Sequence, residues 1–281
     1  MPHYFDTHCH LTLPQSPPLA DHLTEAHALG IDHIFDAGLI HSDIEKRLQL
    51  LSSPHSSSKP TTNTLPPTSP KILIGGAIAP HSDLDPLKLD NALAQLEFYA
   101  RTKKIAAIGE IGLEYFHITD PAHHKFQKKL LHEQLLLAKK YHLPVALHLR
   151  SSETKSAFRD AYTLLKNIHL TTPIISHCFT GNAAEARLML KLGAFLSFAG
   201  IVTFKKSTHL QIIASQIPLE KMLIETDAPY LAPVPMRGKQ NRTAYLLHTQ
   251  KFIAQLRKMP AHTLAAELVK NACTAYVLPS S

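Results

Sequence analysis

The chain has 281 residues, of which 44% are hydrophobic, so it can bury a core large enough for one α/β barrel or for two smaller domains. No apolar run reaches about 18 residues, and the chain opens on Pro2-His3-Tyr4 without a basic segment that leads into an apolar one, which argues against a membrane span and an export signal. Three scattered cysteines exclude a disulfide framework and favour the cytoplasm. The formal net charge of +7 favours a polyanionic partner, although ordinary enzymes reach this charge too.

Short apolar runs and amphipathic segments alternate along the chain. The runs suit eight buried strands at residues 4–9, 31–37, 72–78, 105–111, 144–148, 173–177, 194–198 and 222–225. Helical spacing of apolar residues is present at 87–102, 123–141 and 152–168, and two further amphipathic segments, 243–258 and 261–277, end the chain.

This alternation predicts an α/β fold in which helices cover parallel strands. Eight repeats match a TIM (β/α)8 barrel, and the alternative is an open, doubly wound sheet. We expect one domain over residues 1–281. The segment 52–70, rich in Ser and Thr and with five prolines, is predicted to be an exposed loop inserted before the third strand.

Candidate metal ligands stand at the predicted strand ends. In the first strand the period of two directs Asp6, His8 and His10 to one face and Cys9 away from it. Isolated polar residues also stand where four other strands end, namely Glu110, His148, His177 and Asp227.

The carboxyl ends of barrel strands form one active site, so these residues are expected to converge. Any one of them alone could be a buried, hydrogen-bonded histidine or a carboxylate that caps a helix. Four histidines and two carboxylates together predict a site for Zn²⁺, Mn²⁺ or Mg²⁺.

The motifs that carry these residues resemble those of the TatD family of metal-dependent deoxyribonucleases, and the resemblance covers nearly the whole chain. The matching stretches are Asp6-Thr7-His8-Cys9-His10-Leu11, Gly109-Glu110-Ile111-Gly112-Leu113-Glu114-Tyr115, His148-Leu149-Arg150, His177-Cys178-Phe179-Thr180-Gly181, Ser197-Phe198-Ala199-Gly200-Ile201-Val202-Thr203-Phe204 and Glu225-Thr226-Asp227-Ala228-Pro229-Tyr230-Leu231.

The resemblance implies two divalent metal ions. One would be bound by His8, His10 and Asp227 and the other by His148 and His177, with Glu110 bridging the pair. It also implies that residues at the barrel mouth orient a substrate phosphate, and these are Arg150, Tyr115, Arg237 and Asn241.

The chain also departs from the family pattern. Ala79 stands where a histidine is usual, and Arg242-Thr243 replaces Glu-Pro after Asn241. Glu114 replaces the more frequent Asp, and Ser151-Ser152 interrupt the usual segment after Arg150. These differences are expected to affect the choice of substrate more than metal binding.

We therefore expect a divalent-metal-dependent hydrolase, a nuclease (DNase) that cleaves phosphodiester bonds as a 3'-5' exodeoxyribonuclease on single-stranded or frayed DNA, with RNA as an alternative substrate. Asp227 would accept the proton of the attacking water, and Glu110 would hold the cations together. The protein is expected to act as a monomer without a membrane partner. One alternative is an amidohydrolase-type enzyme for a lactone, ester, amide or aminoacyl-tRNA. A second is an inactive nucleic-acid-binding scaffold, which would bind DNA with steep salt dependence but without turnover.

Overall fold

The computed structural model describes residues 3–14, 17–51 and 69–279. Its eight strands are β1 (Tyr4–Cys9), β2 (Ile31–Asp36), β3 (Lys71–Gly76), β4 (Ala107–Glu114), β5 (Val145–Arg150), β6 (Ile174–His177), β7 (Phe195–Phe198) and β8 (Met222–Ile224). The α-helices of the described residues are α1 (Leu19–Ala28), α2 (Ile44–Leu51), α3 (Leu89–Arg101), α4 (Pro121–Tyr141), α5 (Ala157–Ile168), α6 (Ala183–Lys191), α7 (Thr208–Gln216), α8 (Leu246–Leu256) and α9 (Ala261–Ala275).

The strand order confirms the predicted (β/α)8 barrel. The strands form one eight-stranded sheet in the order β1 to β8. The last strand also meets the first, because the Thr7 hydroxyl donates to the carbonyl of Ile224 at 2.8 Å. An open, doubly wound sheet lacks this contact between its outer strands, so that alternative is wrong.

By its internal contacts the chain divides into two compact units. Unit 1 comprises Met1–Asp36, Glu45–Leu73 and Phe198–Ala272, and unit 2 comprises Ala37–Ile44, Ile74–Ser197 and Cys273–Ser281. The expectation of a single domain over residues 1–281 stays a prediction. The predicted loop 52–70 lies, for residues 52–68, outside the described part of the chain.

Unit 1 is built on β1, β2 and β8. Strand β1 pairs in parallel with β2, and every β1 residue after Tyr4 is buried. Helix α9 is fixed to β8 by Asn271, whose side-chain amide donates to the carbonyls of Met222 at 2.9 Å and Leu219 at 2.8 Å. The Thr7–Ile224 hydrogen bond holds the N-terminal strand beside β8, which lies more than two hundred residues later in the sequence.

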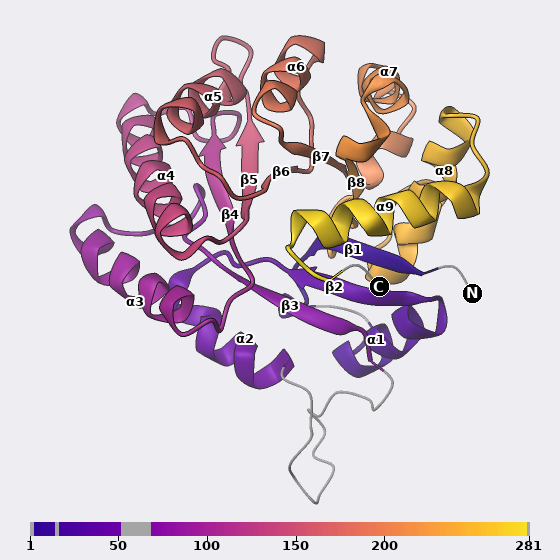
Figure 1. The fold of residues 1–281 in the computed structure, drawn as a ribbon, viewed down its shortest axis with the longest axis horizontal. Helices are drawn as coiled ribbons and strands as arrows, with labels where there is room; N and C mark the ends of the chain where they lie inside the picture. Colours follow the sequence, from indigo (N-terminus) through magenta and orange to yellow (C-terminus); the bar gives the residue numbers. More distant parts are fainter. Residues whose placement is uncertain (1–2, 15–16, 52–68, 280–281) are drawn as a thin grey trace, which may run out of the picture. The chain divides into compact units, whose positions relative to one another are not determined.

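Unit 2 contains the parallel pairs β4–β5, β5–β6 and β6–β7, and helices α3, α4, α5 and α6 follow one another along them (Figure 1). Local sequence explains where these helices begin. The Asp120 carboxylate accepts the N–H of Ala122 ahead of α4, and Asn182 and Glu185 form a capping box on α6.

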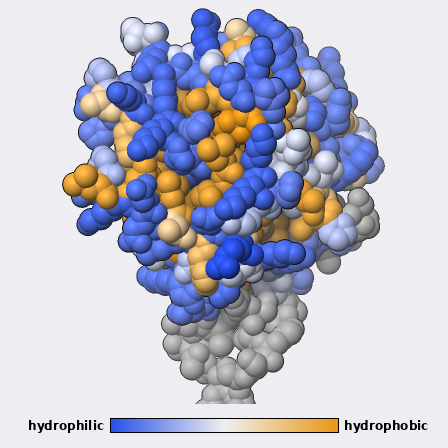
Figure 2. All heavy atoms as spheres, turned by 60° about the vertical axis from the view of Figure 1, so that its left-hand side comes forward, coloured by the Kyte–Doolittle hydropathy of each residue, from blue (hydrophilic) through white to orange (hydrophobic). Residues whose placement is uncertain are grey.

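In Figure 2, which brings the side of α3 and α4 forward, apolar side chains lie in patches among hydrophilic ones.

Several element boundaries differ from the predicted ones. Strand β4 runs to Glu114 and β5 to Arg150, because the two strands stay paired beyond His148 and the Tyr115 N–H donates to the Arg150 carbonyl at 2.8 Å. Glu110 and His148 therefore lie further from the ends of their strands than the predicted bounds placed them. Helix α5 starts at Ala157 instead of 152, because Ser156 caps it by accepting the Arg159 N–H at 3.1 Å. Helices α3 and α8 each follow a short 3-10 turn, at Pro86–Lys88 and Thr243–Tyr245.

Candidate metal centre

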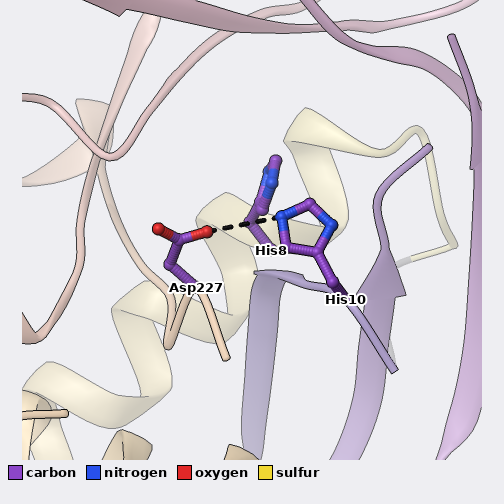
Figure 3. A group of neighbouring side chains, drawn as sticks. All are labelled: His8, His10 and Asp227. Atoms are coloured by element: carbon purple, nitrogen blue, oxygen red, sulfur yellow. Dashed lines mark ion pairs between the residues drawn. The ribbon is translucent and has the colours of Figure 1, made fainter. Parts of the chain in front are cut away.

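Unit 1 gathers three of the predicted ligands around one point. His8 comes from β1, His10 follows that strand, and Asp227 follows β8 (Figure 3). One ligand atom from each lies within 4.8 Å of the others, and His10 Nε2 lies 3.5 Å from an Asp227 carboxylate oxygen. Ligand atoms bound at about 2.0–2.2 Å to a tetrahedral ion are about 3.3–3.6 Å apart. The spacing of this cluster therefore fits a divalent cation.

Backbone hydrogen bonds hold the two contributing segments against each other. The His10 N–H donates to the Ala228 carbonyl at 2.8 Å, and the Asp227 N–H donates to the His8 carbonyl at 2.9 Å. Each ligand-bearing segment thus fixes the other. Asp227 itself has a positive φ of 57°, a conformation that turns the chain sharply after β8.

Asp6 supports this cluster through hydrogen bonds to the residue before Asp227. It lies on the predicted ligand face, but its carboxylate accepts from the Thr226 N–H at 2.9 Å and from the Thr226 hydroxyl at 2.5 Å. Burial raises the pKa of the Asp6 carboxyl to about 7, while the hydrogen bonds from Thr226 lower it. Asp6 therefore positions the segment that carries Asp227.

A buried ion pair that the sequence analysis missed anchors the chain after His10. The Asp36 carboxylate accepts from the Leu11 N–H at 2.7 Å and from Arg47 Nε at 2.8 Å. Both side chains of the pair are almost fully buried. The signal in the sequence was a charged residue at the end of an apolar run, followed by an arginine within the next helix.

Unit 2 holds a second cluster on three adjacent strands, formed by Glu110 of β4, His148 of β5 and His177 of β6. Glu110 Oε1 lies 2.6 Å from His148 Nδ1 and 3.5 Å from His177 Nε2. The parallel register brings the histidines side by side, because His148 is paired with His177. These three donors lie together as the sequence predicts, through the register of the strands.

The electrostatics of this cluster stabilise a negative carboxylate and a positive imidazole. Burial opposes ionisation of Glu110, but the neighbouring His177 and His148 hold its pKa well below the usual range. Burial likewise lowers the pKa of His148, yet Glu110 and Glu114 raise it to about 9. The second partner is close, because His148 Nε2 lies 3.0 Å from Glu114 Oε2. Glu110 and His148 would hold a cation here only after His148 loses a proton, so metal binding would release a proton.

His81 joins this second cluster, and the sequence analysis did not include it among the ligands. One ligand atom each of His81, Glu110 and His148 lie within 4.8 Å of one another, and the rings of His81 and His148 are 5.5 Å apart. The sequence signal was present in the stretch that departs from the family pattern, where Ala79 is followed two residues later by this histidine.

Two of the four residues expected to contact substrate have internal partners. Tyr115 is buried, and its hydroxyl donates to Asp160 at 2.9 Å. Asn241 is buried, and its amide donates to the carbonyls of Thr226 and Tyr230.

The other two expected residues are arginines that lie over aromatic rings. The Arg150 guanidinium lies 4.5 Å from the ring centroid of Phe116, and that of Arg237 lies 4.3 Å from the ring centroid of Phe204. The substrate contacts of Tyr115, Asn241 and both arginines stay predictions.

The departures from the family pattern have local partners. Ser151 donates its hydroxyl to Glu185 at 2.9 Å, and Arg242 forms an ion pair with Glu25 at 3.2 Å. Ala79 is buried. The longer side chain of Glu114 reaches His148 and also accepts the N–H groups of Phe116 and His117. Within the described chain, these departures leave all six candidate ligands of the two clusters in place.

Both clusters consist of imidazole nitrogens and carboxylate oxygens, the donors that Zn²⁺, Mn²⁺ and Mg²⁺ accept. The Cys9 thiol is turned away from them and contacts the Phe35 carbonyl at 3.8 Å. The number and identity of the ions, and the bridging role expected of Glu110, stay predictions. No helix in the described parts of the chain is long and apolar enough to span a membrane.

Comparison with known proteins assigns the family. The family model described as TatD related DNase matches residues 5–277. An uncharacterized metal-dependent hydrolase of Bacillus subtilis, YabD, is 31% identical over 271 residues, which cover 95% of this chain and 96% of YabD. Another from Escherichia coli, YjjV, is 30% identical over 277 residues, with 98% of both chains covered.

Solved structures agree with this assignment. The crystal structure of YjjV, a TatD homologue from Escherichia coli, matches with a TM-score of 0.79 at 27% identity over 98% of both chains. A TatD family hydrolase from Entamoeba histolytica has the same fold, with a TM-score of 0.78 at 20% identity over 98% of both chains. The chain therefore belongs to the TatD family of metal-dependent hydrolases.

Proposed function

We propose that this hydrolase cleaves phosphodiester bonds and removes nucleotides from the 3' end of single-stranded or frayed DNA. The observation that carries the proposal is the pair of clusters, each of which combines imidazole and carboxylate donors on strands of the barrel or directly after them. The match to the family model named TatD related DNase supports DNA as the substrate. RNA is the closest alternative, since it has the same diester linkage.

Divalent cations would supply Lewis acidity, which acidifies water and neutralises charge on a phosphate. His8 and His10 would hold such an ion, since both are buried and lie beside Asp227. Asp227 is proposed to accept the proton of the attacking water, because its side chain is the most exposed of this cluster, at 12% against 5% for His10. In unit 2, Glu110 with His148 and His177 would hold the second ion.

Arg150 is proposed to orient the substrate phosphate. It ends β5, two residues after His148, so both residues lie on the same face of the strand. Its side chain is half-buried and its guanidinium lies over the Phe116 ring, which restricts where its N–H donors point. A planar fork of donors suits a phosphodiester better than a lysine at this position would.

The test is the shortening of a single-stranded oligonucleotide labelled at its 5' end, after EDTA treatment and after Mn²⁺, Mg²⁺ or Zn²⁺ is added back. We expect a ladder of products that depends on metal and is abolished by Glu110→Gln. Glu153→Gln is the matched control, because Glu153 is an exposed glutamate of the same unit. A full ladder from Glu110→Gln, with metal content unchanged, contradicts the assignment of that residue.

Substrate form separates this proposal from its rivals. An exonuclease requires an end, so closed circular single-stranded DNA should resist digestion while the linear form is degraded. Turnover of lactones or esters, with DNA left intact, would instead identify an amidohydrolase activity. Salt-dependent DNA binding without turnover under any metal would identify a binding scaffold. Action as a monomer in the cytoplasm stays a prediction.

A further inference from the structure

Unit 2 contains a cavity beside its metal cluster. The cavity has a volume of about 730 Å³ and lies between residues 80–86, which follow β3, and residues 117–127, which lead into α4. This volume falls within the range of about 300–1,000 Å³ typical of small-molecule sites. Apolar and imidazole groups line it, among them Pro80, His81, Leu84, His117, Ile118 and Phe126.

The apolar side of the cavity is firmly supported. Leu84 and Phe126 pack against a buried cluster of the core formed by Ile78, Leu89, Ala92 and Leu130. Gln127 joins the two walls, since its amide donates to the Pro80 carbonyl at 3.2 Å and its side-chain oxygen accepts the Glu114 N–H at 3.1 Å. The cavity is therefore formed before any ligand arrives.

The cavity and the metal cluster share residues. His81 lines the cavity and also offers a nitrogen within 4.8 Å of ligand atoms of Glu110 and His148. Glu114 contacts His148 with one carboxylate oxygen and accepts the N–H of His117 with the other, at 2.9 Å. A molecule in the cavity would thus lie directly beside the cation that the cluster would bind.

The negative charges that line the cavity disfavour a phosphate group as its ligand. Asp83, Asp85 and Asp120 line the cavity. The Ala122 N–H and the His123 side chain lower the pKa of Asp120, so this carboxylate is negative at neutral pH. Asp85 accepts the Leu87 N–H at 3.0 Å. Three carboxylates disfavour a polyanion and admit an uncharged group that can stack and donate hydrogen bonds to them.

We propose that this cavity binds the nucleobase of the nucleotide whose phosphate is cleaved, an uncharged heteroaromatic ring, and that His81 lies between base and metal cluster. The inference rests on the proposed function for the identity of the substrate. The rings of the nucleobase would contact Phe126 and Ile118. The negatively charged carboxylates that line the cavity would keep the rest of the DNA strand outside. The cavity therefore makes the enzyme require a base next to the scissile bond.

A cavity-filling variant tests this without dependence on activity. Ala122 lines the cavity at the second residue of α4, is exposed, and donates its N–H to the capping Asp120. Ala122→Trp would fill the space with an indole. Ala184→Trp is the matched control, because Ala184 is exposed at the second residue of α6 and donates its N–H to the capping Asn182. The chain has no other tryptophan, so indole emission reports which new side chain is shielded from water.

The measurement is equilibrium dialysis of labelled deoxyadenosine against metal-free protein. We expect the wild type and Ala184→Trp to retain the nucleoside with a Kd of about 1 mM or tighter, and Ala122→Trp to lose at least about tenfold in affinity. In the nuclease assay Ala122→Trp should raise KM more than it lowers kcat. If Ala122→Trp does not fold, Ala122→Leu takes its place. This smaller side chain fills part of the cavity and should cause a smaller loss of affinity.

Two results would overturn the inference. The first is no retention of deoxyadenosine by the wild type at about 1 mM. The second is equal retention by Ala122→Trp and wild type with the indole emission blue-shifted, which would place the base elsewhere. Retention of the nucleoside by a protein that cleaves no nucleic acid would refute the proposed function and leave the base-binding cavity standing.

Discussion

Removal of Arg47 should destabilise the protein strongly, because it leaves the Asp36 carboxylate buried without its counter-ion. The side chains of Arg47 and Asp36 are 2% and 0% exposed and lie 2.6 Å apart. Loss of one partner of such a pair costs about 3–5 kcal/mol. With an m-value of about 3 kcal/mol/M, the urea midpoint of Arg47→Met should fall by about 1–1.7 M. Arg101→Met, which removes an exposed arginine at the end of α3, should shift stability by less than about 0.5 kcal/mol.

A double variant decides whether the buried charge is the cause. Asp36→Asn removes the charge but keeps an oxygen for the Leu11 N–H, which the native Asp36 accepts at 2.7 Å. Asp36→Asn with Arg47→Met should therefore be about 1–3 kcal/mol more stable than Arg47→Met alone, and urea unfolding followed by circular dichroism measures the difference. A double variant as unstable as the single variant, or less stable, would refute the reasoning, because the loss would then come from packing.

Three further changes have defined outcomes. A Cβ on Gly112 would lie 1.9 Å from the His148 carbonyl oxygen, so Gly112→Ala should displace that strand and lower kcat by about a hundredfold in the nuclease assay. Thr226→Val removes the hydroxyl that donates to Asp6 and should cost about 1–3 kcal/mol in urea unfolding; an unchanged midpoint would contradict this. Burial lowers the pKa of His22 to about 4. As pH falls, the His22 side chain is therefore protonated in the unfolded chain at a higher pH than in the folded protein. Stability that is present above about pH 6.5 is lost as the pH falls towards 4. His22→Gln should flatten that pH dependence, and an identical profile would show that another group causes it.

The fold and the clustering of most candidate metal ligands could be predicted because both depend on short-range patterns. The period of two along the first strand predicted that His8 and His10 point the same way, and the alternation of apolar runs with amphipathic helices indicated the barrel. Boundaries were less well predicted. Apolar composition ended one run at residue 111, whereas pairing with β5 extends β4 to Glu114.

The supporting residues could not be predicted in the same way. Asp6 was predicted to share one face of the first strand with His8 and His10, and its carboxylate accepts from the hydroxyl of Thr226, 220 residues away in the chain. The substrate contact of Tyr115 stays a prediction, and its hydroxyl donates to Asp160. Nothing local to either residue indicates its partner, since each partner comes from a different strand or helix.

By itself the sequence determined which residues can bind a cation and which strands carry them, because side-chain direction along a strand and donor chemistry are local properties. The tertiary structure decided which carboxylates face a cluster and which hold the chain in place, as with Asp36. It also brought His81 to both the second cluster and the cavity. The physical reason is that the state and partner of a buried polar group depend on desolvation and on charges brought close by folding, and neither is set by the neighbours in sequence.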